Sequence, residues 1–343
     1  MDKPSLKSLK TRRRLVQVSD AALVQETLLA AAQSLPLMIQ PIVNGLSLLT
    51  WVEQNLPRLQ THLHTHGGIL FRGFALSGSQ EFGEFMAAVS TTPMSYSYRS
   101  TPRTQVEGNV YTSTEYPADR TIPLHNEMAY ARQWPLTLAF YCQQPALEQG
   151  ETPIADSRRV LARIPEDIRQ KFADLGVLYV RNYGGGLDLP WQEVFQTEDR
   201  QEVETFCRQA DIEFEWWGTD QLRTRQVCDA IATHPHTHDT VWFNQAHLFH
   251  ASNLGEAQQH LEHWPRNAYF GDGSEITKAV LAEIRAAFAQ ETILFPWQSG
   301  DVLLLDNMLT AHGRRPFTGP RRVLAGMADP YSSQDVQAAK EVS

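Results

Sequence analysis

The sequence predicts a mainly β domain of the α+β class, with a jelly-roll or β-barrel core and helices packed outside it. Runs rich in β-branched and aromatic residues recur through the chain, and stretches of helical character separate them. No linker rich in Pro, Gly and Ser interrupts the 343 residues. These observations favour a single domain over two.

Helices are expected mainly near the N-terminus and between the strand-like runs. Residues 20–34 are rich in alanine and leucine, and Asp20 is a suitable cap for a helix there. Ser47 is placed to cap a second helix. A more polar stretch further along the chain also has helical character. The predicted helical segments are 20–34, 47–63, 78–90, 191–232 and 274–290.

Strands are expected where β-branched and aromatic residues cluster, and GDVLLLDN at 300–307 is the strongest such run. The other predicted strands are 69–74, 110–116, 136–142, 176–184, 240–245 and 321–327. We therefore expect an N-terminal tail and helix packed on the core over 1–34, one jelly-roll domain over 35–332 and a C-terminal tail over 333–343.

Composition excludes several functional classes. A formal net charge of −9 argues against a nucleic-acid partner held by phosphate contacts. No apolar run approaches the length of a membrane span, and the N-terminus lacks the features of a secretory signal. Cys142, Cys207 and Cys228 are odd in number and form no CxxC pair, which predicts reduced thiols in a cytoplasmic protein.

The segment TIPLHNEMAY places His125 two residues before Glu127. In an extended segment, residues two apart project to the same side, so an imidazole and a carboxylate can hold one metal ion together. His312, shortly after the strong strand at 300–307, can supply a third ligand. Two histidines and one carboxylate form the facial triad of non-haem iron oxygenases, which leaves positions open for cosubstrate and oxygen.

A His-x-Glu pattern is weak by itself in a chain with 12 histidines and 39 acidic residues. A second match, His260 and Glu262, lies in a polar stretch of helical character. On a helix, residues two apart point to nearly opposite sides, so this pair is not expected to chelate a metal ion.

Further residues strengthen the first match. Arg321 and Arg322 stand at the start of the strand that follows His312, and a guanidinium there can hold a carboxylate through paired hydrogen bonds. Thr152, between the ligands in GETPIADSR, can donate a hydroxyl hydrogen bond to the same carboxylate. That carboxylate would be the distal one of 2-oxoglutarate, whose keto-acid end would chelate iron.

The order of these motifs resembles the taurine dioxygenase superfamily, and in particular its branch of antibiotic and amino-acid tailoring hydroxylases related to clavaminate synthase. The motifs are His125-x-Glu127, then Gly150-Glu151-Thr152, then His312 followed by the arginine pair. The resemblance extends over about residues 35–332. Other phrases similar to that branch are HGGILFRGF at 66–74, VYTSTEYP at 110–117 and VWFNQAHLFH at 241–250.

The resemblance implies a double-stranded β-helix with Fe(II) bound by His125, Glu127 and His312. It also implies 2-oxoglutarate held by Thr152 and by Arg322, with Arg321 as the alternative, and O₂ as the second cosubstrate. Gly326 stands where taurine dioxygenase has a sulfonate-binding arginine, so a taurine-like substrate is not expected.

The expected reaction is hydroxylation of an unactivated C–H bond of an amino acid or amino-acid derivative, coupled to decarboxylation of 2-oxoglutarate to succinate and CO₂. The substrate can be free or tethered to a carrier protein. Two alternatives stay open: desaturation or cyclisation by the same oxidant, and a non-catalytic module that binds metal and 2-oxoglutarate.

Candidate substrate contacts are less well defined. Asn244, Gln245 and His247 lie in an aromatic segment that can line a pocket, and Arg99 can pair with a substrate carboxylate. The alternating histidines of HPHTHD at 234–239 are interpreted as part of a polar loop and not as a second metal site.

Overall fold

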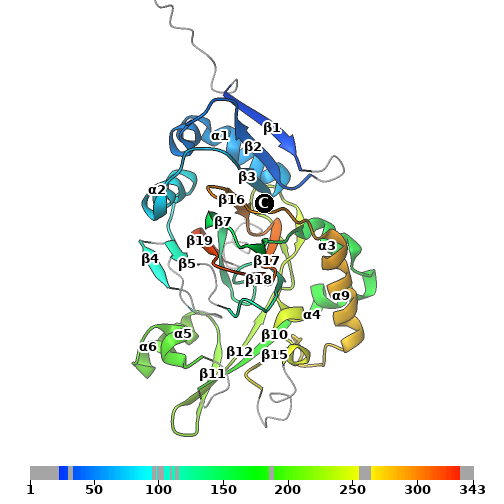
Figure 1. Ribbon diagram of the computed structural model, residues 1–343. Coiled ribbons are helices and arrows are strands. Elements are labelled where there is room, and N and C mark those ends of the chain that lie inside the picture. The colour runs from blue at the N-terminus through cyan, green and yellow to red at the C-terminus, as the bar shows by residue number, and fades with distance from the viewer. Residues whose placement is uncertain are drawn as a thin grey trace, which may run out of the picture.

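The computed structural model describes residues 23–29, 34–94, 98, 104–108, 110–112, 116–184, 189–254 and 264–332. The largest sheet within these ranges has eight strands, which run through the middle and upper part of Figure 1. In spatial order they are β1 (Val24–Leu28), β2 (Leu37–Pro41), β3 (Gly68–Phe71), β16 (Val302–Asp306), β7 (Gln133–Gln144), β19 (Arg322–Ser332), β5 (Val110–Thr112) and β4 (Gln105–Glu107).

A three-stranded sheet lies against the eight-stranded one, and its strands are, in spatial order, β6 (Ile122–His125), β17 (Thr310–Arg314) and β9 (Ile154–Asp156). The ring of Phe140 on β7 lies 5.0 Å from the ring of His312 on β17, which places the two sheets face to face. Both sheets are antiparallel apart from the pairing of β2 with β3. Two antiparallel sheets around one apolar core form the jelly-roll arrangement that the sequence predicts.

Helices α1 (Leu48–His66) and α2 (Gly78–Val89) cover the outer face of the large sheet. Their apolar side chains pack with Leu304 and Leu324, whereas Leu303 and Ala325, the next residues along the same strands, face the inner core. This alternation follows from the two-residue period of a strand. Ser47 caps α1 by accepting a hydrogen bond from the Thr50 amide at 3.3 Å, as the sequence predicts.

Insertions extend the domain beyond the two sheets (Figure 1). A four-stranded sheet has the spatial order β11 (Glu213–Trp217), β12 (Gln221–Cys228), β10 (Val177–Tyr183) and β15 (Arg266–Phe270). The two remaining strand pairs are β13 (Ile231–Thr233) with β14 (Thr240–Trp242), and β18 (Phe317–Thr318) with β8 (Glu148–Gln149). The other helices are α3 (Ser157–Arg163), α4 (Glu166–Leu175), α5 (Trp191–Phe195), α6 (Arg200–Gln209), α7 (Ala246–Phe249), the 3₁₀ turn η2 (Ala251–Asn253) and α9 (Lys278–Glu291).

The helix predicted over 20–34 is wrong. Residues Val24–Leu28 form strand β1, which pairs antiparallel with β2 at the edge of the large sheet. The Ala- and Leu-rich composition favours a helix locally, but pairing with β2 satisfies the backbone and overrides that preference.

The helical prediction over 191–232 is half wrong. Helices α5 and α6 occupy its first part, and β11, β12 and β13 occupy the rest. In β12 the burial alternates residue by residue, because only one face of this sheet packs on the protein.

None of the described helices combines the length and the apolar character that a membrane crossing requires.

Candidate active site

His125 and His312 are brought together by strand pairing. They are register partners in the antiparallel pair of β6 and β17, and their ring centroids lie 4.6 Å apart. Directly opposed residues of neighbouring strands project to the same face of a sheet. The distance between the two histidines is therefore set by the sheet itself.

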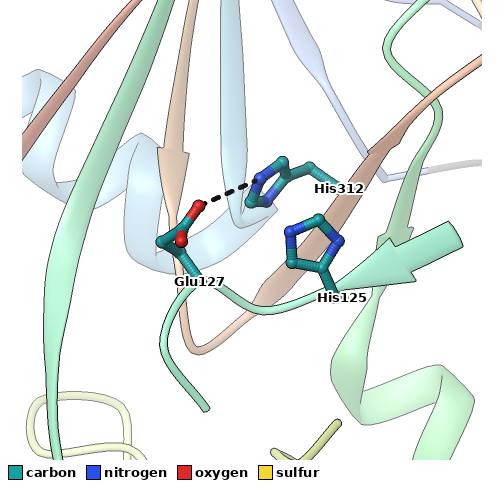
Figure 2. A group of neighbouring side chains, drawn as sticks. All are labelled: His125, Glu127 and His312. Carbon is teal, nitrogen blue, oxygen red and sulfur yellow. Dashed lines mark ion pairs between the residues drawn. The ribbon is translucent and has the colours of Figure 1, made fainter. Parts of the chain in front are cut away.

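Glu127 reaches the two histidines from a turn. Strand β6 ends at His125, residues 127–130 form a turn, and Met128 has φ 58°. The Glu127 Oε2 atom lies 3.8 Å from His312 Nε2. The strand expected to carry the whole His-x-Glu motif thus ends two residues before Glu127, yet the carboxylate still points toward both imidazoles (Figure 2).

Each of these three side chains offers one ligand atom, and the three atoms lie within 4.8 Å of one another. Among the described residues, no other group of three or more His, Cys, Asp or Glu side chains meets this condition. Glu127 and His312 are buried, with 3% and 4% of their surface exposed, whereas His125 is half-buried. The site is therefore closed on the protein side and accessible on the side of His125.

The orientation of His125 suits metal binding. Its Nδ1 lies 2.8 Å from the carbonyl oxygen of Pro123. Because a carbonyl can only accept, Nδ1 carries the proton and Nε2 keeps its lone pair for a metal ion. A hydrogen bond of this kind fixes both the tautomer and the direction of a ligating histidine.

Asn307 holds the backbone of Glu127. Its Oδ1 accepts from the Glu127 amide at 2.7 Å, and its Nδ2 donates to the Glu127 carbonyl at 2.9 Å and to the Pro135 carbonyl at 2.8 Å. Asn307 is fully buried. Asn307 was not among the residues selected from the sequence, although the Asp-Asn pair at the end of the predicted strand 300–307 is a usable signal.

Thr152 is buried close to the ligands. It lies two residues before Ile154, the register partner of His312 in β9. The Thr152 Oγ1 accepts a hydrogen bond from Trp297 Nε1 at 3.1 Å. A hydroxyl carries one donor and two acceptor sites, so its proton can still be donated to a bound anion.

The two arginines of the pair differ in environment. Arg321 is partly buried, and its Nε donates to the Gly150 carbonyl at 3.0 Å, two residues from Thr152. Arg322 is exposed. The geometry therefore favours Arg321, the alternative of the two in the sequence prediction, as the candidate contact to 2-oxoglutarate. Arg321 lies just before β19, which begins at Arg322, and the register of β19 with β7 shifts between Arg322 and Val323.

Arg314 is a second buried cation near Arg321. Its guanidinium donates to the carbonyls of Tyr116, Pro117 and Arg120 at 2.6 to 3.0 Å. Burial, followed by the charge of Arg314, lowers the pKa of Arg321 to about 10. An anion binds favourably beside two neighbouring cations that the protein shields from water.

The side chains of Asn244, Gln245 and His247, which the sequence suggested as substrate contacts, hydrogen-bond to backbone groups of the protein. Gln245 Nε2 donates to the Asn126 carbonyl at 2.7 Å, and His247 Nε2 contacts the Leu124 carbonyl at 2.8 Å. Asn244 donates to the Ala230 carbonyl and accepts from the Ala246 amide. The remaining sequence-selected residues Arg99, His260 and Glu262 lie outside the described residues.

The HPHTHD segment behaves as a loop, as expected. His234 Nε2 lies 2.8 Å from Asp306 Oδ2, and His234 Nδ1 accepts from the amides of His236 and Thr237. Both ring nitrogens of His234 are thus used by the protein.

A comparison with protein families places the chain in a known family. Residues 31–328 match the family model described as "Taurine catabolism dioxygenase TauD, TfdA family". The chain belongs to this family. Membership confirms the expected enzyme class, an iron(II)- and 2-oxoglutarate-dependent dioxygenase. The group of His125, Glu127 and His312 offers the two imidazoles and one carboxylate that could hold the metal ion.

Two known proteins are similar to this chain over most of their length. The dapdiamide synthesis protein DdaC of Enterobacter agglomerans is 45% identical over 275 residues, which cover 78% of this chain and 84% of DdaC. A clavaminate synthase-like protein of Arabidopsis thaliana is 34% identical over 280 residues, or 78% of this chain and 83% of the relative.

Solved structures share the fold at low sequence identity. The PvcB protein from Pseudomonas aeruginosa superposes with a TM-score of 0.55 at 15% identity, over 89% of this chain and 90% of PvcB. AAD-2, solved with Mn(II) and N-oxalylglycine, gives a TM-score of 0.55 at 11% identity, over 89% of this chain and 96% of AAD-2. These likenesses support the jelly-roll fold of the TauD, TfdA family.

Proposed function

We propose that this dioxygenase hydroxylates an unactivated C–H bond of an amino-acid-derived small molecule in specialised metabolism. In this reaction 2-oxoglutarate is decarboxylated to succinate and CO₂, with one oxygen atom of O₂ entering succinate and the other entering the hydroxylated substrate. The observation that carries the proposal is the meeting of His125, Glu127 and His312 within 4.8 Å on a chain that belongs to the TauD, TfdA family.

The three side chains are suited to hold Fe(II). Two imidazole nitrogens and one carboxylate oxygen on one side of an ion leave the other side open. A bound iron would supply the activation of O₂. The protein's part is to fix the ligand geometry: strand pairing sets the two histidines, the Pro123 carbonyl orients His125, and Asn307 holds Glu127.

Arg321 and Thr152 are suited to bind the distal carboxylate of 2-oxoglutarate. The guanidinium of Arg321 offers further N–H groups beside the one that bonds Gly150, and a charged pair formed out of water is strong. The hydroxyl of Thr152 can add a donor. The positive charge of Arg314 makes the same position more favourable for an anion.

A sulfonate substrate of the taurine type stays disfavoured, for a revised reason. A side chain at Gly326 would meet Met86 of α2, so this position faces away from the site. The neighbouring position, Ala325, faces the site and is the register partner of Phe140. The side chain of Ala325 also carries no charge. Neither position can supply a cation to a sulfonate.

The names of the two relatives support a role in tailoring small molecules. One belongs to dapdiamide synthesis, and the other is clavaminate synthase-like. We infer from the 45% identity with DdaC that this chain also acts on an amino-acid-derived compound, either free or attached to a carrier protein. A cytoplasmic location is part of this proposal.

Anaerobic titration of the purified protein with Fe(II) and 2-oxoglutarate tests the metal site directly. We expect a weak metal-to-ligand charge-transfer band in the visible for the intact chain and none for His125→Ala. Succinate release in air, measured with candidate amino-acid derivatives, then separates an enzyme from a non-catalytic binding module. Mass spectrometry of the product distinguishes hydroxylation, which adds 16 mass units, from desaturation or cyclisation, which removes 2.

A further inference from the structure

We propose that Gln245 and His247 are positioning residues that set the geometry between His125 and Glu127 at the metal. This inference rests on the proposed function, because it concerns the same iron site. It assigns the two side chains a role different from the substrate contact that the sequence suggested.

The need for such residues follows from where the strand ends. His125 is the last residue of β6, so its position is fixed by pairing with β17. Glu127 lies beyond the strand, in a turn that continues through Met128 at φ 58°. No sheet pairing holds the backbone between the two ligands, although both must meet one ion. Side chains have to supply that constraint.

Gln245 and His247 bind the carbonyls on either side of His125. The Gln245 amide donates to the Asn126 carbonyl at 2.7 Å, and the His247 ring nitrogen donates to the Leu124 carbonyl at 2.8 Å. Both side chains are buried, with 2% and 3% of their surface exposed. Hydrogen bonds out of water between well-placed groups resist displacement, because breaking one leaves a buried polar atom unpaired.

The segment that carries these side chains is itself anchored to other elements. The backbone amide of Gln245 donates to the Tyr179 hydroxyl of β10 at 2.8 Å. Arg285 of α9 donates to the His247 carbonyl at 3.2 Å, and the His247 ring packs against Phe288 at 4.6 Å. The metal-binding turn is therefore fixed to β10 and α9 as well as to Asn307.

The same contacts weaken the alternative that Gln245 and His247 recognise the substrate. Their donor groups point at the backbone of residues 124–126. Removing a residue that orients a metal-ligating side chain in this way typically weakens metal binding by about 10- to 100-fold.

The test compares two substitutions in one segment. Gln245→Met keeps the length of the side chain and removes the donor to Asn126. The matched control is Asn244→Met, because Asn244 is also buried and its side chain bonds the Ala230 carbonyl and the Ala246 amide, away from residues 124–127. Melting of both apo variants by circular dichroism reports the loss of stability. Anaerobic Fe(II) titration with 2-oxoglutarate reports metal affinity and the position of the charge-transfer band.

We expect Gln245→Met to weaken Fe(II) binding by about 10- to 100-fold and to move the band, and Asn244→Met to lower the melting temperature without either effect. Equal Fe(II) affinity and an unmoved band in folded Gln245→Met would overturn the proposal. A wild-type chain that binds no Fe(II) would instead refute the proposed function.

If Gln245→Met does not fold, a pair of variants at His247 tests the proposal instead. His247→Phe keeps the ring and removes the donor to Leu124, and His247→Gln restores a donor at a similar reach. Weak Fe(II) binding in His247→Phe that recovers in His247→Gln supports positioning. Equal Fe(II) affinity in both variants contradicts it.

Discussion

His125 and His312 face each other as register partners of β6 and β17, with ring centroids 4.6 Å apart. This relationship follows from the backbone pairing of β6 with β17, which holds the two imidazoles side by side. A metal ion that binds there meets two imidazoles already in place and needs only the turn residue Glu127 to complete the set. Preorganised ligands lose little conformational entropy on binding.

The first prediction concerns the third ligand. Glu127→Gln keeps the shape of the side chain and the hydrogen bonds of its backbone to Asn307, but it removes the anionic ligand. We expect the fold to persist and Fe(II) affinity to fall by at least about 100-fold, the upper end of the loss typical for residues that only support a ligand. Calorimetric titration with Fe(II) under argon measures this. Unchanged affinity would exclude Glu127 as a ligand.

The second prediction separates the two arginines. Arg321→Ala removes a partly buried guanidinium next to Gly150, whereas Arg322→Ala removes an exposed one. Loss of one partner of a buried charge pair costs about 2 kcal/mol or more, so we expect Arg321→Ala to raise the Kd for 2-oxoglutarate by at least about 30-fold. Arg322→Ala should change it by less than about 3-fold. The charge-transfer band, titrated with 2-oxoglutarate on the Fe(II)-loaded variants, gives both values. The opposite order would restore Arg322 as the cosubstrate arginine.

Much of this architecture could be read from the sequence. Strands such as 300–307 carry continuous apolar runs because both faces of β16 are buried, and such runs are recognisable without a structure. The three candidate metal ligands could be selected because the residue types, order and spacing limit the alternatives. Their convergence could not be derived, since it depends on the pairing of β6 with β17, which lie far apart in the chain.

Other features depend on tertiary contacts that local patterns do not encode. Residues 24–28 form a strand only because β2 offers an edge to pair with. The preference between Arg321 and Arg322 depends on which residue faces the core, and a shift of one position reverses it. Gln245 and His247 were selected from the sequence as candidate substrate contacts, and the roles that we propose for them depend on which backbone atoms they meet.

The third prediction concerns the three cysteines. Cys142, Cys207 and Cys228 are free thiols, as the sequence predicts, and all three are buried. Burial raises the pKa of each thiol to about 12. Only the thiolate reacts rapidly with disulfide reagents. We expect no reaction with a coloured aromatic disulfide near neutral pH in the folded protein, and three equivalents after unfolding in guanidinium. Rapid reaction of the folded chain would show that one of these thiols becomes accessible.

The fourth prediction concerns stability in mild acid. Burial lowers the pKa of His247 from 6.5 to about 4, so the folded state keeps this imidazole neutral. Between these two values the unfolded chain binds more protons than the folded one, and the free energy of unfolding therefore falls as the pH drops from 6.5 toward 4. A shift of this size corresponds to about 3 kcal/mol for this residue.

His247→Gln removes the titrating group and keeps a donor for the Leu124 carbonyl. We expect the variant to lose less stability than the wild type over the same interval, by up to about 3 kcal/mol. Urea unfolding at several pH values, followed by circular dichroism, measures the difference. His64 and His250, whose pKa values burial also lowers, are unchanged in the variant, so their contribution cancels in the comparison. Parallel pH profiles of the two proteins would show that His247 is already protonated, or freely solvated, in the folded state.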